Sequence, residues 1–260
     1  MHEHAPPLAA AQGRRPRIPD TPQRASLERS RRIREIVFGA QDGLLTTLGI
    51  VTGVGGATDA RATILLAGGI STLVGALSMG VGEYLGGKAE REVVEHWVDV
   101  EQREMLENTD EEIAEQIGYY RQKGFPPDEA RMIVDRLTKH PDIWLHEMVR
   151  DEFGIDPRDS QFAGLSSTFA MAGSFAAGGI IPVLPYLFPL SHLVALLVSL
   201  VLAVCGLFVV GVIAARIAQR SALRKGLEIV AFGAAVFGIS YLAGHFIPPL
   251  FGRGPVSAGG

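Results

Sequence analysis

Five apolar stretches, each about the length of a membrane-crossing helix, constrain the fold of this chain more than any other feature. A helix needs about 20 residues to cross the hydrocarbon core of a bilayer, where every backbone polar group must be satisfied within the segment. We therefore predict an all-α membrane protein with five transmembrane helices and a helical insert between helices 2 and 3. The stretches lie roughly at residues 36–56, 63–86, 162–184, 191–214 and 226–249.

Charge is strongly segregated along the chain. Residues 88–159 hold 20 of the 28 Asp and Glu residues but only 10 of the 24 Lys and Arg residues. Basic residues gather instead before the first span and between the fourth and fifth. Because Lys and Arg near span ends mark the cytoplasmic side, we place the N-terminus and residues 88–160 in the cytoplasm. Short loops and the lack of an organelle signal favour a bacterial plasma membrane, with a vacuolar membrane as the alternative.

These patterns divide the chain into five segments. The Arg- and Pro-rich beginning is poor in apolar residues, which predicts disorder up to about Ser26. The expected order is a disordered cytoplasmic tail at 1–32, transmembrane helices 1 and 2 at 33–87, the acidic insert at 88–160, transmembrane helices 3 to 5 at 161–251, and a flexible tail at 252–260.

Turn-forming residues divide the insert into three or four predicted helices. Asn108 interrupts the first, Gly124 ends the second, and Pro127 and Pro141 lie where the third and fourth begin. Thr109 followed three residues later by Glu fits a capping box that opens the second helix.

Acidic residues in the insert are paired at helical spacing. Glu101 and Glu104 are three residues apart, and Glu112 and Glu115 repeat that spacing on the next predicted helix. Such like-charged pairs destabilise a helix, and a bound divalent cation would remove the repulsion. Met148 and Glu152 share a face of the last helix, and a thioether beside carboxylates favours a transition metal over calcium or magnesium. The alternative is that the acids form a solvated surface and that Met148 belongs to a core.

An ionisable residue, Asp42, lies inside the first apolar stretch. An acid near the middle of a span costs roughly 2.5–3.5 kcal/mol, so it indicates an ion path, a proton relay or a buried partner. The structural alternative is a hydrogen bond to Thr46 or Gln41. The flanking Gly39 and Gly43 indicate close helix packing, either within the chain or across a dimer.

Met79 and Glu83 lie four residues apart in the second stretch and share a helix face. Antiparallel packing of the first two spans would bring Met79 near Asp42, with Glu83 and Glu35 closer to the cytoplasm. These four residues form the predicted transport path. For the two glutamates, the alternative is an interfacial position from which the side chains reach water.

Several segments resemble the vacuolar iron transporter family of divalent-metal transporters, over roughly residues 33–250. They are Gly39-Ala40-Gln41-Asp42-Gly43-Leu44, Ser78-Met79-Gly80, the Glu-rich insert, and Gly178-Gly179-Ile180-Ile181-Pro182-Val183-Leu184-Pro185-Tyr186. The resemblance implies five membrane helices per subunit and a homodimer with its metal path between the subunits. It also implies proton-coupled movement of Fe²⁺ out of the cytoplasm, with some tolerance for Mn²⁺, Co²⁺ or Zn²⁺.

Residue by residue, the resemblance assigns Asp42 and Met79 to the path. The chain departs from the family pattern at Val149, where a second methionine is common, and at Ser71, where an acid is common. Glu83 is our candidate to substitute for that acid. The ligands that the resemblance implies for the insert are Glu101, Glu104, Glu112, Glu115, Met148 and Glu152.

Two other functions compete with a transporter. A membrane-anchored carboxylate ferroxidase would normally use Glu-x-x-His pairs, and no histidine here follows a glutamate by three residues. We therefore expect no enzymatic activity. A metal sensor that is merely anchored in the membrane would need no acid inside a span. The presence of Asp42 therefore argues against this function. Nothing in the sequence indicates nucleic-acid binding, because membrane orientation explains the basic stretch.

Overall fold

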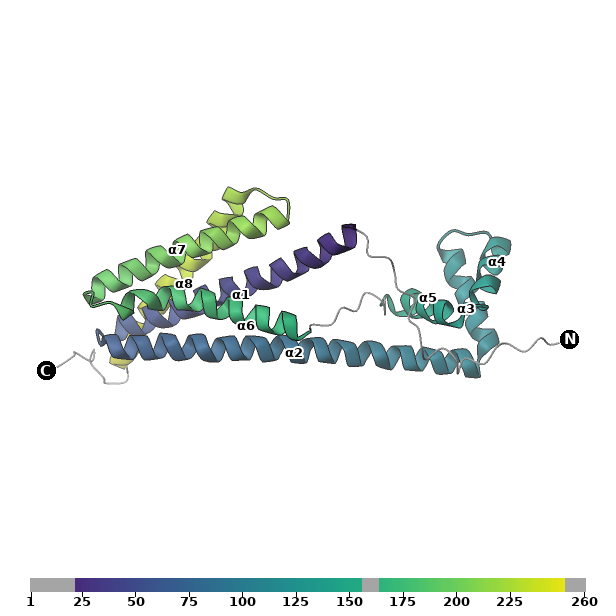
Figure 1. The fold of residues 1–260 in the computed structure, drawn as a ribbon, viewed down its shortest axis with the longest axis horizontal. Helices are drawn as coiled ribbons and strands as arrows, with labels where there is room; N and C mark the ends of the chain where they lie inside the picture. Colours follow the sequence, from purple (N-terminus) through teal and green to yellow (C-terminus); the bar gives the residue numbers. More distant parts are fainter. Residues whose placement is uncertain (1–21, 156–163, 251–260) are drawn as a thin grey trace. The chain divides into compact units, whose positions relative to one another are not determined.

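The computed structural model describes residues 22–155 and 164–250, which form helices and their connections (Figure 1). Within these ranges no strand occurs, so the predicted all-α class is confirmed. The elements are α1 (Pro22–Ala57), α2 (Arg61–Glu107), α3 (Thr109–Gln122), α4 (Pro127–Leu137), α5 (Pro141–Phe153), α6 (Leu165–Val183), the 3₁₀ helix η2 (Leu184–Leu187), α7 (His192–Ile217) and α8 (Ala222–Leu250).

The described residues form two compact units, which divide at Gly86 within α2. The membrane unit comprises residues 22–85 and 164–250, and the insert unit comprises residues 86–155. Helix α2 contributes its first half to the membrane unit and its second half to the insert unit.

The five predicted transmembrane helices are confirmed by length and composition. Helices long and apolar enough to cross a bilayer are α1 from Arg32, α2, α6 with η2, α7 and α8. Leu66, Ile70, Leu73 and Leu77 follow one another along α2, and each exposes more than half of its surface. In a bilayer this apolar surface contacts lipid instead of water, so the exposure matches a membrane location.

Helix α1 is the centre of the membrane unit, and its most extensive contact is with α6. Glycines make this contact possible. A Cβ atom at Gly43 would lie 2.1 Å from the Phe175 carbonyl oxygen, and one at Gly178 would lie 2.2 Å from the Ala40 carbonyl oxygen. Small residues let helix backbones approach this closely. For Gly43, packing within the chain is therefore confirmed over a dimer contact.

Polar contacts fix the end of α6. Pro182 lies in its last turn, and the Ser199 hydroxyl donates to the Pro182 carbonyl at 2.7 Å. The chain then tightens into η2, where the Arg61 guanidinium donates to the carbonyls of Tyr186 and Leu187, each at 2.5 Å. Arg61 thus satisfies backbone acceptors that the end of a helix leaves unpaired.

The insert unit has a small core of its own. Met105 from α2 packs with Trp144 and Met148 from α5, and partly buried side chains of α3 and α4 complete the cluster. The Trp97 ring stacks on Phe153 with their centroids 4.6 Å apart. Of the three or four helices predicted for this segment, four are present: the second half of α2, and α3, α4 and α5.

Two predicted details are wrong. Thr109 does not cap α3, because its hydroxyl donates to the Met105 carbonyl at 2.8 Å and Asn108 holds the N-cap position. The expected tail at 1–32 is also too long, because α1 begins at Pro22. Proline suits a first helical position, and the Arg, Leu, Glu and Ala residues that follow are strong helix formers. Residues 1–21 and the predicted tail at 252–260 lie outside the described residues.

Candidate metal sites

The predicted insert ligands come from three helices that share the insert core. Glu101 and Glu104 lie on α2, Glu112 and Glu115 on α3, and Met148 and Glu152 on α5. Glu101 and Met148 are fully buried, and Glu112 is 7% exposed. Glu104, Glu115 and Glu152 are exposed at the rim. The structure therefore brings two buried acids and three exposed acids into one neighbourhood.

Glu101 is the buried centre of this neighbourhood. No N–H or O–H group of the described residues donates to either of its carboxylate oxygens. Burial and, after it, the neighbouring carboxyls of Glu152, Glu112 and Glu104 raise the pKa of Glu101 to about 8. Glu101 therefore holds a proton at neutral pH.

The neighbouring acids are perturbed in the same direction. Burial, followed by repulsion from Glu115, Glu104 and Glu152, raises the pKa of Glu112. Burial also raises the pKa of Glu152, and repulsion from Glu115 and Glu104 adds to that shift. These carboxyls titrate together, so a cation that enters the cluster must compete with bound protons.

Two findings argue against a complete metal site at this cluster within a single chain. Among residues 22–155 and 164–250, no three His, Cys, Asp or Glu side chains are arranged to hold a metal ion together. Met148 is part of the core beside Met105 and Trp144, so it has the packing role that we set against a ligand role. Its role as a ligand stays a prediction.

In the membrane unit, Asp42 is half-buried on α1. The Thr46 hydroxyl donates to its Oδ1 at 3.2 Å, so the expected structural hydrogen bond is confirmed. Glu35 lies seven residues earlier, on nearly the same face of α1. Its Oε2 is buried and has no hydrogen-bond partner among the described residues.

The predicted contact of the first two spans is wrong at the level of Met79. There α6 lies between α1 and α2 (Figure 1), since the Gly43 backbone meets the Phe175 carbonyl while Gly75 on α2 meets the Phe175 ring. The small residues of α6 allow both neighbours to approach it. Within one chain, α6 thus separates the α1 and α2 segments that carry Asp42 and Met79. Met79 and Glu83 are both half-buried on α2.

The membrane unit also holds polar groups that the sequence did not indicate. The Thr47 and Thr72 hydroxyls, both buried, lie 3.1 Å apart where α1 and α2 do meet, and Thr72 donates to the Gly68 carbonyl at 2.8 Å. Threonine is common in membrane helices, so its presence gave no signal. His192 and Asp59 form a second overlooked pair, and an ionisable residue at a span end was the available signal.

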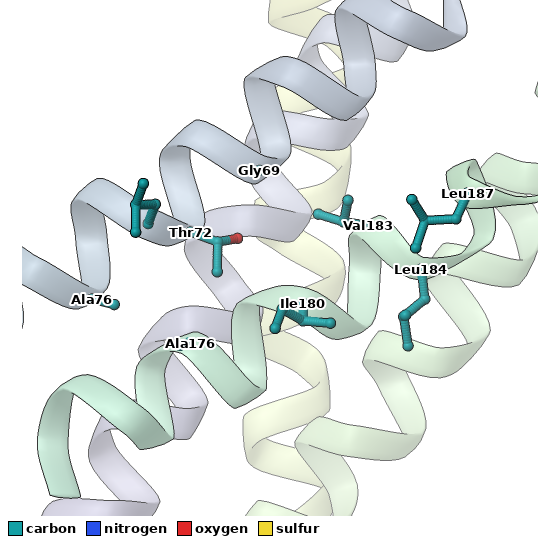
Figure 2. Close-up of a pocket in the computed structure, with 9 residues that line it drawn as sticks. Gly69, Thr72, Ala76, Ala176, Ile180, Val183, Leu184 and Leu187 are labelled. Carbon is teal, nitrogen blue, oxygen red and sulfur yellow. The ribbon is translucent and has the colours of Figure 1, made fainter. Parts of the chain in front are cut away.

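A cavity of about 420 Å³ lies between α2 and the α6–η2 segment (Figure 2). Thr72 contributes the one hydroxyl side chain among its lining residues. None of the predicted path residues lines it. A cavity with this lining suits an apolar chain, such as lipid, and does not suit a hydrated cation.

Comparison with known proteins adds an independent finding. The sequence matches the VIT family over residues 33–245. It is 33% identical to vacuolar iron transporter 1 of Arabidopsis thaliana over 202 residues, which cover 78% of this chain and 80% of that protein. It is 30% identical to vacuolar iron transporter 1 of Eucalyptus grandis over 212 residues, which cover 80% of this chain and 85% of that protein. Protein CCC1 of Saccharomyces cerevisiae is 26% identical over 222 residues, which cover 80% of this chain and 67% of that protein. Because the family match spans most of a chain with five membrane helices, the protein is a multi-pass membrane protein of the VIT family.

Proposed function

We propose that this protein transports Fe²⁺ out of the cytoplasm. The observation that carries the proposal is Asp42, an acid held half-buried inside a transmembrane helix with the Thr46 hydroxyl as its partner. Such a group is costly in lipid and marks a path for cations or protons. Membership of the VIT family and relatives named vacuolar iron transporters support iron as the cargo. Mn²⁺, Co²⁺ and Zn²⁺ are further candidate substrates.

The insert is the proposed entry point for metal. Carboxylate oxygens bind divalent cations, and the acids around Glu101 repel one another until a proton or cation joins them. Fe²⁺ that binds there displaces protons. The proposed ligands are Glu101, Glu104, Glu112, Glu115, Met148 and Glu152.

From the insert, metal passes to Glu35 and Glu83 and then to Asp42 and Met79. We propose that the protein is a homodimer, because α6 separates Asp42 from Met79 within one chain and a second subunit would supply the missing neighbours. Two facing copies of Asp42 in a medium of low dielectric would repel each other unless a cation or a proton joined them. Protons returning to these carboxylates therefore release the metal, which makes transport an exchange of Fe²⁺ for protons.

The proposed orientation follows from the positive charges at the span ends. The N-terminus and residues 88–160 face the cytoplasm, and the connection between α1 and α2 faces the opposite compartment. A bacterial plasma membrane remains our proposal, and the names of the relatives support the vacuolar alternative.

The test is Fe²⁺ flux into proteoliposomes that contain a pH indicator. The wild-type protein should move Fe²⁺ with opposite movement of protons, and Asp42→Asn should abolish both. Glu228→Gln is the matched control, because Glu228 is an exposed acid near the membrane that pairs with Lys225 at 2.9 Å. Intact flux in Asp42→Asn would refute the mechanism. Metal binding by the protein without any flux would favour the anchored sensor, and aerobic oxidation of Fe²⁺ would favour the ferroxidase.

A further inference from the structure

A second candidate metal site lies at the end of the membrane unit that contains the connection between α1 and α2. Asp59 belongs to the connection between these helices, and His192 is the first residue of α7. The His192 Nε2 atom lies 3.5 Å from Asp59 Oδ1. Because α2 crosses the membrane from Arg61 toward Leu85, this pair lies at the opposite end of the span from the insert connection.

The separation of the two atoms is that of an ion pair, and it is also the spacing that two ligands of one metal ion would have. Hydrogen bonds from nitrogen to oxygen normally span about 2.7–3.2 Å. With metal–ligand bonds of about 2.1 Å, two ligands of a tetrahedral ion lie about 3.4 Å apart. Imidazole nitrogen and carboxylate oxygen are both ligands that zinc, cobalt and ferrous iron accept.

The side chains behind the pair support this interpretation. His192 Nδ1 is buried and, within the described residues, has no hydrogen-bond partner, and the same is true of the Tyr186 hydroxyl. Tyr186 is 1% exposed. The His192 Cε1 atom and the Tyr186 hydroxyl lie 3.3 Å and 3.7 Å from the point where a Cβ at Gly55 would be. The imidazole and the hydroxyl thus border the same small space beside Gly55, and no other group of the described residues binds the Nδ1 side of the ring.

Other charged groups near this end determine the strength of the site. Arg61 lies two residues from Asp59, and its guanidinium is held by two carbonyls of η2. His245 on α8 stacks with Tyr241, with its backbone nitrogen beside Gly56. The positive charge of Arg61 weakens cation binding at Asp59. Two protein ligands beside a cation give the modest affinity that a release site requires, because a transported ion must be able to leave.

We propose that His192 and Asp59 bind the departing divalent cation on the exit side of the membrane. Water would complete a tetrahedral coordination sphere. The exit role rests on the proposed transport function, whereas the metal-binding property rests on the geometry alone.

The binding test uses Co²⁺ as the probe and the full chain in detergent micelles. Tetrahedral Co²⁺ with nitrogen and oxygen ligands absorbs visible light more strongly than octahedral Co²⁺ does. Sites made only of carboxylates and water favour the octahedral geometry. The wild-type protein should show the tetrahedral band, and Zn²⁺ should displace it. His192→Gln and Asp59→Asn should each weaken Co²⁺ binding by about tenfold or more. His245→Gln, which changes the other histidine at this end, should leave the band unchanged.

The two substitutions also separate loss of the site from loss of the fold. The Asp59 side chain is 73% exposed, so Asp59→Asn should keep the unfolding temperature of the wild-type protein. An unchanged Co²⁺ band in this variant and in His192→Gln would overturn the proposal. The absence of a tetrahedral band in the wild-type protein would overturn it as well.

A transport measurement tests the exit role. Zn²⁺ added on the Asp59 side of proteoliposomes should slow Fe²⁺ flux through the wild-type protein and have less effect on Asp59→Asn. Equal inhibition of both proteins would refute the exit role. If the wild-type protein binds Co²⁺ through His192 but carries no Fe²⁺, the proposed function fails while the site stands.

Discussion

The stability of the insert should fall as pH rises, and Glu101 should cause most of that fall. The folded protein holds the Glu101 proton up to about pH 8, whereas the unfolded chain releases it near the ordinary value of 4.5. Between these values the folded state binds more protons, so the free energy of unfolding decreases with increasing pH. At about 1.36 kcal/mol per pH unit, the loss between pH 5 and pH 7 is about 2–3 kcal/mol.

The measurement can be made on the full chain. Both tryptophans of the protein, Trp97 and Trp144, lie in the insert unit, so intrinsic fluorescence during urea unfolding reports on this unit. Glu101→Gln should remove most of the pH dependence and raise the stability at pH 7 by about 2–3 kcal/mol, because a neutral amide does not have to take up a proton on folding. Asp135→Asn, which changes an exposed acid on α4, should leave the slope unchanged.

Metal gives the same experiment a second readout. Mn²⁺ at pH 7 should stabilise the wild-type insert, because it binds to the folded state. This binding displaces the Glu101 proton. Glu101→Gln should show less stabilisation. An insert whose stability rises with pH, or whose pH slope is the same in Glu101→Gln, would refute our account of the cluster.

Two further predictions concern the membrane unit. Gly43→Ala should lower the unfolding temperature, because its Cβ would lie 2.1 Å from the Phe175 carbonyl oxygen. Gly69→Ala should raise it, because a Cβ there would meet nothing within 4 Å and alanine is favoured over glycine in a helix by about 0.5–1 kcal/mol. Equal effects of the two substitutions would contradict the packing of α1 on α6. Arg61→Gln should destabilise the α6 end by about 1.5–3 kcal/mol for each lost charged hydrogen bond, and an unchanged melting curve by circular dichroism in micelles would contradict that contact.

Much of the fold could be predicted from sequence because its signals are local. Span length follows from the thickness of the bilayer, and Pro127 and Pro141 mark the starts of α4 and α5. The neighbours of each span could not be predicted, since hydrophobic length does not say which helix packs on which. That is why α6, which carries Gly178, was not expected between α1 and α2. The failed cap at Thr109 has a different cause, because its hydroxyl had a competing acceptor in the preceding turn.

The candidate sites show the same division. Spacing placed Glu101 and Glu104 on one helix face, but the burial of one and the exposure of the other depend on how α3 and α5 pack against α2. The pair of Asp59 and His192 joins residues far apart in the chain, so no local motif could indicate it.

The contact of α1 with α6 has a consequence for the making of the protein. Helix α6 begins more than 100 residues after α1 ends, with α2 and the whole insert in between. At about 5–20 residues per second, roughly 5 to 20 seconds of synthesis separate the two helices. During that interval the glycine-lined face of α1 remains in the bilayer or the translocon without the helix that covers it. Biogenesis of this protein therefore depends on holding α1 in place until its partner has been made.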